Sequence, residues 1–273
     1  METEMIKDVM FVVRGKLKRA NLFTGKLLNL IFIIPLFFSL TVIAGCNMEN
    51  DKNKQQTAKE DPETKDYVTQ TKASQAVMSP DEALMMLKNG NDRFVNQNML
   101  KRDLIEQVNE TEDGQYPFAA IVSCIDSRIP TEIVFDQGVG DIFNARIAGN
   151  FVNQDILGSL EFSTKVAGSK TIVVMGHTSC GAVKGAADNV KLGNLTAMLK
   201  NLEPAVKAAS DVPGEKSSQN AEYVQKISDK NVELTIEKML ADSDVLREMY
   251  ENGEITIVGA MYDVKSGKVT FME

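Results

Sequence analysis

The sequence predicts an α/β fold: an open, mainly parallel sheet of about four strands plus a terminal strand, flanked by helices. Four short apolar runs, at residues 118–122, 142–147, 171–175 and 255–260, alternate with longer helical stretches. Strands that are apolar along their whole length are typical of parallel sheets covered by helices on both faces. The composition, with 43% hydrophobic and 25% charged residues, is that of an ordinary globular protein.

The first 46 residues have the pattern of a targeting segment. Basic residues outnumber acidic ones before an uncharged run at 27–45, which ends in Ile43-Ala44-Gly45-Cys46. This ending resembles the bacterial lipobox, in which the chain is cut before the cysteine and the thiol receives a lipid. We therefore expect a lipoprotein signal peptide at 1–46, a lipid anchor at Cys46 and an extracytoplasmic position on a bacterial membrane. The alternative is an uncleaved membrane helix, because the run is close to the ~20 residues needed to span a bilayer.

Residues 47–79 predict a flexible tether, since they are mostly polar and cannot bury enough apolar surface to offset the entropy of ordering. The string Ser79-Pro80-Asp81-Glu82 then combines an N-cap hydroxyl, a proline and a capping glutamate. This combination predicts the first helix of a catalytic domain at 80–273.

The remaining elements follow in order along the chain. Helical spacing of apolar residues predicts helices at 156–166, 195–209 and 217–250, and a short helix that starts at Cys180. Near the end, Ser266-Gly267 predicts a turn between extended pieces at 262–264 and 269–271.

The net charge argues against a nucleic-acid partner, and the small numbers of cysteine and histidine limit the possible metal and acid–base sites. A formal net charge of −8 leaves no concentrated basic face, so we expect no nucleic-acid partner. Three cysteines are too few for a disulfide framework, and the chain has a single histidine.

These rare residues follow two of the predicted strands. Cys124 comes just after the run at 118–122, and His177 and Cys180 come just after the run at 171–175. Because ligands bind beyond the carboxyl ends of parallel strands, we expect the three side chains to meet. Two thiolates and an imidazole suit zinc, and three protein ligands leave a fourth position open, as in catalytic zinc sites. The alternative is that both cysteines and the histidine are ordinary buried residues, or that Asp126 closes the site.

The motifs around these residues resemble those of the β-carbonic anhydrase family. The strings are Ser123-Cys124-Ile125-Asp126-Ser127-Arg128, residues 140–150 (GDIFNARIAGN), Gly176-His177-Thr178-Ser179-Cys180-Gly181, and residues 259–264 (GAMYDV) with Ser266-Gly267. The resemblance implies a zinc ion held by Cys124, His177 and Cys180, with Asp126 and Arg128 as a catalytic pair beside it. It also implies a homodimer, or a larger homo-oligomer, whose subunits share the substrate pocket.

The resemblance further indicates which form of the family this is. One form has a tryptophan and a glycine where this chain has Ile121 and Ser123. The other form resembles the plant enzymes and has a glutamine nine residues before the first cysteine, where Gln115 stands. Phe143 and Phe162 match two aromatic pocket positions, although Phe162 replaces a tyrosine, and Gly181 at the start of its helix completes the substrate-binding candidates. We therefore expect an open zinc site at neutral pH.

The leading functional hypothesis is reversible hydration of carbon dioxide to bicarbonate and a proton by a zinc-bound hydroxide. One alternative is a relative that hydrolyses carbonyl sulfide or carbon disulfide, and another is a non-catalytic zinc-binding lipoprotein. A dithiol redox protein is a third, although the cysteines lack the C-x-x-C spacing. Since the single histidine is an expected ligand, proton transfer should depend on external buffer or on a carboxylate or tyrosine.

Overall fold

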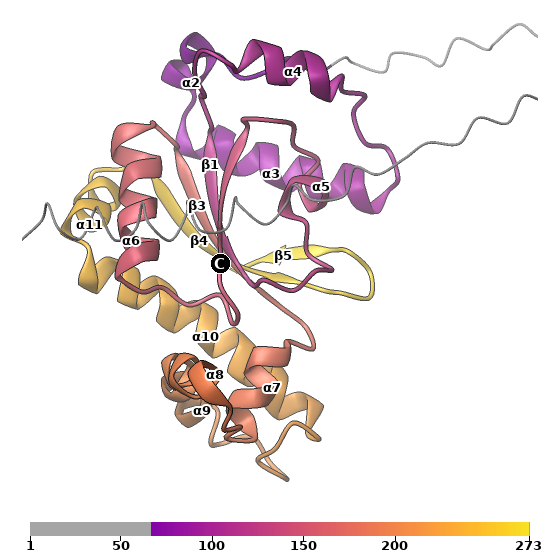
Figure 1. Ribbon diagram of the computed structural model, residues 1–273, viewed down its shortest axis with the longest axis vertical. Coiled ribbons are helices and arrows are strands. Elements are labelled where there is room, and N and C mark those ends of the chain that lie inside the picture. The colour runs from indigo at the N-terminus through magenta and orange to yellow at the C-terminus, as the bar shows by residue number, and fades with distance from the viewer. Residues whose placement is uncertain (1–66, 273) are drawn as a thin grey trace, which may run out of the picture. The chain divides into compact units, whose positions relative to one another are not determined.

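The computed structural model describes residues 67–272, which form a five-stranded sheet with helices on both faces (Figure 1). The sheet order is β2-β1-β3-β4-β5. The first four strands in the chain pair in parallel and β5 is antiparallel to β4. The strands are β1 (Ala119–Ser123), β2 (Ile142–Arg146), β3 (Thr171–His177), β4 (Thr256–Tyr262) and β5 (Val269–Phe271). The predicted fold class is thus confirmed.

The helices cover the sheet in two layers, because successive strand residues point to opposite faces. Val173 of β3 packs in one cluster with Leu87, and Val174 packs in the other with Leu160. The helices and helical turns are α2 (Lys72–Val77), α3 (Pro80–Val95), α4 (Leu104–Glu110), α5 (Thr131–Val134), α6 (Gln154–Glu161), the π-helix η2 (Phe162–Val166), α7 (Gly181–Ala187), α8 (Gly193–Leu199), the 3-10 turn η3 (Lys200–Leu202), α9 (Glu203–Ala208), α10 (Ala221–Asp242) and α11 (Asp244–Glu251).

Local signals set several of these boundaries. Ser79 caps α3 through the predicted capping box, with Oγ accepting from the Glu82 N–H and the Glu82 carboxylate accepting from the Ser79 N–H. The helix expected at 217–250 is interrupted at Ser243, whose Oγ caps α11 and donates to Glu161 Oε1 at 2.6 Å. The helix expected at 195–209 is likewise divided into α8, η3 and α9.

The folded part begins earlier than the tether prediction allowed. Tyr67 donates its hydroxyl to Asp141 Oδ1 at 2.6 Å, and buried Gln75 of α2 donates to the carbonyls of Pro117 and Ala167 at 2.7 and 2.8 Å. The expectation of a flexible tether as far as Ser79 is therefore corrected for 67–79. Composition could not reveal these contacts, because their partners lie 42 to 92 residues away.

The longest of the described helices, α10, packs closely against the middle of the sheet. The two methyl groups of Val232 sit where Cβ atoms on Gly176 of β3 and Gly259 of β4 would lie 2.8 Å away. A side chain at either glycine would force Val232 and a neighbouring methionine, Met261 or Met272, to shift. This close approach fixes the position of α10 relative to the carboxyl end of β3, where the candidate site begins.

The signal peptide at 1–46, Cys46 and most of the expected tether lie outside the described residues. Within 67–272, none of the helices combines the length and the apolar character needed to cross a membrane.

Candidate metal centre

The centre is built at the carboxyl ends of two neighbouring parallel strands. In the β1–β3 pair, Ser123 lies beside Met175, so Cys124 follows β1 next to the last residues of β3. His177 ends β3, and Cys180 is the N-cap of α7. The sequence prediction that these three residues meet is confirmed, since their ligand atoms all lie within 4.8 Å of one another.

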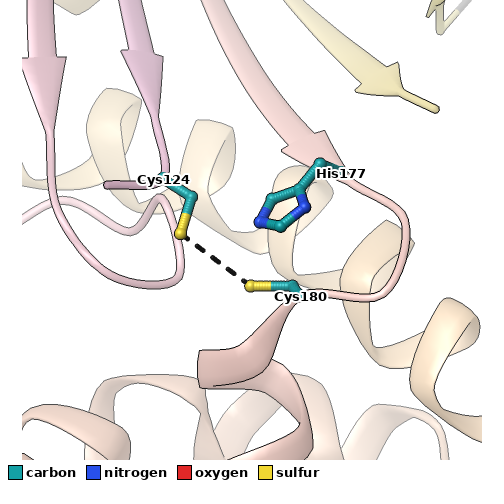
Figure 2. A group of neighbouring side chains, drawn as sticks. All are labelled: Cys124, His177 and Cys180. Carbon is teal, nitrogen blue, oxygen red and sulfur yellow. Dashed lines mark hydrogen bonds between the residues drawn. The ribbon is translucent and has the colours of Figure 1, made fainter. Parts of the chain in front are cut away.

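The three side chains form a buried donor set suited to a metal. Figure 2 shows the imidazole of His177 turned toward the two sulfur atoms, which are 4.0 Å apart. Cys124, His177 and Cys180 are 4%, 0% and 1% exposed. His177 Nδ1 lies 3.0 Å from the Thr178 carbonyl, which can only accept, so in the neutral imidazole Nδ1 carries the proton and Nε2 presents a lone pair. Nε2 is buried and has no hydrogen-bond partner among residues 67–272, as a metal ligand would require.

Each of the two thiols changes the ionisation of the other. The neighbouring Cys180 thiol first, and then the His177 side chain and the backbone N–H of Gly149, lower the pKa of Cys124 to about 4, although burial opposes this shift. The neighbouring Cys124 sulfur and burial raise the pKa of Cys180, and backbone N–H groups of Val183 and Ala182 oppose that rise. The Cys124 thiol thus ionises readily on its own, and a bound divalent cation would also favour ionisation of the Cys180 thiol.

Asp126 and Arg128 form the charged pair expected beside the ligands. Arg128 Nε lies 2.9 Å from Asp126 Oδ1, and Nη2 lies 2.7 Å from Oδ2. This fork holds the pKa of Asp126 well below its usual range. The same Oδ2 is 3.9 Å from His177 Nε2, so the carboxylate borders the ligand atoms while both its oxygens are held by the guanidinium.

Three residues that the sequence did not single out for a role, Arg146, Gly149 and Asn231, form hydrogen bonds around Cys124 and Asp126. Arg146 donates to the carbonyls of Cys124 and Asp126 at 3.0 and 2.7 Å. The Gly149 N–H donates to Cys124 Sγ at 3.4 Å, and Asn231 donates to the Gly149 carbonyl at 2.8 Å. Arg146 and Gly149 lie inside the family motif at residues 140–150, but nothing in the sequence around Asn231 connects it to the site.

The substrate-binding candidates do not all lie near the ligands within one chain. Gly181 begins α7 directly after Cys180. Gln115 is exposed and precedes β1, at the opposite end of that strand from Cys124. Phe143 of β2 and Phe162 of η2 contact each other edge to face, with ring centroids 6.2 Å apart, and line a pocket of about 610 Å³ that none of the three ligands touches.

Comparison with known proteins identifies the family. A family model described as "Carbonic anhydrase" matches residues 119–269. "Carbonic anhydrase 2" of Mycobacterium tuberculosis is 32% identical over 197 residues, covering 71% of this chain and 94% of the relative. The chain belongs to the β-carbonic anhydrase family. A relative from Mycolicibacterium smegmatis, named "Carbonic anhydrase", is 33% identical over 193 residues, covering 70% of this chain and 92% of its own.

Solved structures of the family share this fold. The β-carbonic anhydrase CafA of Aspergillus fumigatus matches with a TM-score of 0.55 at 24% identity, covering 71% of this chain and 90% of that one. One of two tetrameric β-carbonic anhydrases of Sordaria macrospora also gives 0.55 at 23% identity, covering 70% and 95%. Family membership and the donor set together identify zinc as the cofactor, with Cys124, His177 and Cys180 positioned to bind it.

Proposed function

We propose that this chain catalyses the reversible hydration of carbon dioxide to bicarbonate and a proton at the zinc centre. The observation that carries the proposal is the buried Nε2 of His177, which faces two sulfur atoms and has no hydrogen-bond partner in the described part of this family member. When bound, zinc would act as a Lewis acid that generates a nucleophile from water at neutral pH.

The pair Asp126 and Arg128 would orient the reacting water. Asp126 Oδ2 would accept a hydrogen bond from it, which the 3.9 Å distance from this atom to His177 Nε2 supports. Arg128 would keep the carboxylate ionised and fixed, because a two-point guanidinium contact holds both position and charge. Asp126 would then remain an acceptor and would not become a fourth metal ligand.

We further propose that the active form is a homodimer or larger homo-oligomer with shared pockets. Within one chain, Gln115, Phe143 and Phe162 lie away from the ligand cluster. A second copy that presents these side chains to the ligands would explain how they reach the substrate, and the Sordaria relatives are described as tetrameric.

The membrane attachment is a separate proposal, supported by the sequence of residues 1–46. We infer that Cys46 carries a lipid and that the catalytic domain lies outside the cytoplasm. Mass spectrometry of the N-terminal peptide from the chain expressed in bacteria should show a lipid-modified Cys46. A Cys46→Ser variant should lose the modification while the purified protein keeps its zinc and its hydration activity, whereas an unmodified cysteine in the native chain would contradict the anchor.

The test of the reaction compares the full chain with Cys180→Ser. We expect about one zinc per native chain and rapid carbon dioxide hydration in stopped-flow measurements, both lost in the variant. Zinc binding without hydration at neutral and mildly alkaline pH would contradict the proposal. That outcome would favour a non-catalytic zinc protein, and assays with carbonyl sulfide and carbon disulfide would then test for a hydrolase.

A further inference from the structure

Gly149 joins a metal ligand to a distant helix through its two backbone polar groups. Its N–H donates to Cys124 Sγ at 3.4 Å, and its carbonyl accepts from Asn231 Nδ2 at 2.8 Å. The residue has φ +86°, and a Cβ atom here would lie 2.9 Å from Leu202 Cδ1. Glycine is the residue that suits both this backbone conformation and this space. The residue type at position 149, between the Cys124 sulfur and α10, is therefore closely constrained.

The same glycine has more conformational freedom than any other residue, so its orientation needs external support. On one side, the Ile147 N–H donates to the Ser123 carbonyl and the Asn150 N–H donates to the Ile147 carbonyl, both at 3.0 Å. On the other side, the amide of Asn231 holds the Gly149 carbonyl. Without that amide, rotation about the glycine bonds could turn the N–H away from Cys124.

Asn231 is a polar residue that is almost completely buried. It is 3% exposed, and its neighbour Val232 packs against Gly176 and Gly259 at the middle of the sheet. A buried amide costs stability unless it is hydrogen-bonded. The bond to Gly149 spans 82 residues, so it ties the closely packed helix α10 to the loop beside the metal ligands.

We propose that Asn231 is a positioning residue for the metal centre. By holding the Gly149 carbonyl, it keeps the Gly149 N–H directed at Cys124 Sγ and so tunes the sulfur as a donor to zinc. Hydrogen bonds to a thiolate are charge-assisted, and partners of metal ligands of this kind influence metal affinity. The inference rests on the proposed function in requiring a zinc centre, but it does not depend on the substrate.

The test compares the full chain with Asn231→Leu and Asn231→Asp, which keep the side chain's approximate shape but lose the amide donor. Chelator competition should show zinc affinity about 10–100-fold weaker in both variants. In the cobalt-substituted proteins, the sulfur-to-cobalt charge-transfer band should move to longer wavelength, because a sulfur that loses a hydrogen bond gives up electrons more readily. A purely structural role for Asn231 would not move this band.

Ser228→Ala is the matched control. Ser228 is also buried on α10, and its hydroxyl donates within the helix to the Val224 carbonyl at 3.1 Å. This variant should keep both the native zinc affinity and the native charge-transfer band. Unchanged affinity and band in folded Asn231→Leu and Asn231→Asp would overturn the inference, as would an equal change in Ser228→Ala.

A measurement on the native chain keeps the inference testable if the Asn231 variants fail to fold. With an NMR-active cadmium isotope at the centre, the Gly149 amide proton should show scalar coupling to the metal through sulfur, and the Asn231 amide protons should exchange slowly. Absence of either signal would overturn the inference. A native chain that binds zinc and hydrates carbon dioxide without these signals would leave the proposed function intact, whereas a native chain that binds no zinc would contradict that function itself.

Discussion

Arg128 holds both carboxylate oxygens of Asp126, with Nε 2.9 Å from Oδ1 and Nη2 2.7 Å from Oδ2. The Arg128 side chain is about half exposed, so the pair contributes little to stability in water. What Arg128 does provide is a fixed orientation for the Asp126 carboxylate beside the metal ligands.

Arg128→Ala should therefore impair the reaction more than the fold. Without the guanidinium, Asp126 is free to turn toward the metal position, which its Oδ2 borders. We expect kcat/KM for carbon dioxide hydration to fall by about 10–100-fold, with zinc content unchanged. Stopped-flow kinetics and zinc analysis of the same samples measure the two quantities.

The control for this variant is Arg247→Ala. Arg247 also pairs with an aspartate, Asp244, on the exposed surface of α11, far along the chain from the ligands. Arg247→Ala should leave the rate of carbon dioxide hydration unchanged. Arg128→Lys should be more active than Arg128→Ala but less active than the native chain, because lysine cannot make the two-point contact. Native kinetics in Arg128→Ala would exclude the orienting role.

Removal of the metal should expose two thiols together. Modification of the native chain with a mercurial reagent should release one zinc for the two thiols of Cys124 and Cys180, because both sulfurs belong to one donor set. A coloured zinc indicator follows the release while absorbance follows the thiols. Zinc that stays bound after both thiols react, or a disulfide between them in the native chain, would contradict the metal centre.

Proton export should limit turnover at low buffer concentration. The reaction releases a proton in every hydration cycle, and the chain's only histidine is His177, which belongs to the donor set. Histidine is the side chain that most readily carries protons near neutral pH. Stopped-flow turnover at fixed pH should therefore rise with buffer concentration, and a rate that is independent of buffer would reveal an internal carrier.

Mixing two defective variants should test the shared pocket. A Cys180→Ser chain lacks a ligand but keeps Gln115, and a Gln115→Ala chain keeps the ligands. If Gln115 acts on the neighbouring subunit's centre, a mixed oligomer regains one complete site, so activity after subunit exchange should exceed the sum of the separate variants. Mixing Cys180→Ser with Asp126→Ala is the control, since both defects lie at the ligand end of their own chains and no complete site can form.

The contact between Tyr67 and Asp141 should stabilise the domain in a pH-dependent way. Tyr67→Phe removes a hydrogen bond to a buried carboxylate, at a cost of about 1.5–3 kcal/mol in the free energy of unfolding near neutral pH. Burial raises the pKa of Asp141, while the Tyr67 hydroxyl lowers it by favouring the ionised form. In the variant this pKa is higher still, so the loss of stability should be largest when Asp141 is ionised and should shrink as acidification protonates it.

Urea unfolding of the native and Tyr67→Phe chains at neutral and mildly acidic pH measures this difference. Tyr250→Phe is the control, because Tyr250 is exposed on α11 and its hydroxyl should contribute little at either pH. Equal stability of the native and Tyr67→Phe chains would show that the contact between the Tyr67 hydroxyl and Asp141 does not stabilise the domain.

Local patterns in the sequence determined the fold class and the ligands. Continuous apolar runs predicted the four parallel strands, and the capping box at Ser79 predicted the start of α3, because both signals depend on neighbouring residues alone. The positions of Cys124, His177 and Cys180 after two such runs predicted the metal centre, since parallel strands bring their carboxyl ends to one edge.

Only the tertiary structure decided what surrounds those ligands. Tyr67 joins the folded part through Asp141, 74 residues away, and Asn231 reaches Gly149 across 82 residues. Neither contact could be predicted from local periodicity or a capping residue, because each one joins elements that are far apart in the sequence. The order of residues along the chain predicts the metal ligands. The contact of Asn231 with Gly149 depends instead on the position of α10, where Val232 packs against Gly176 and Gly259.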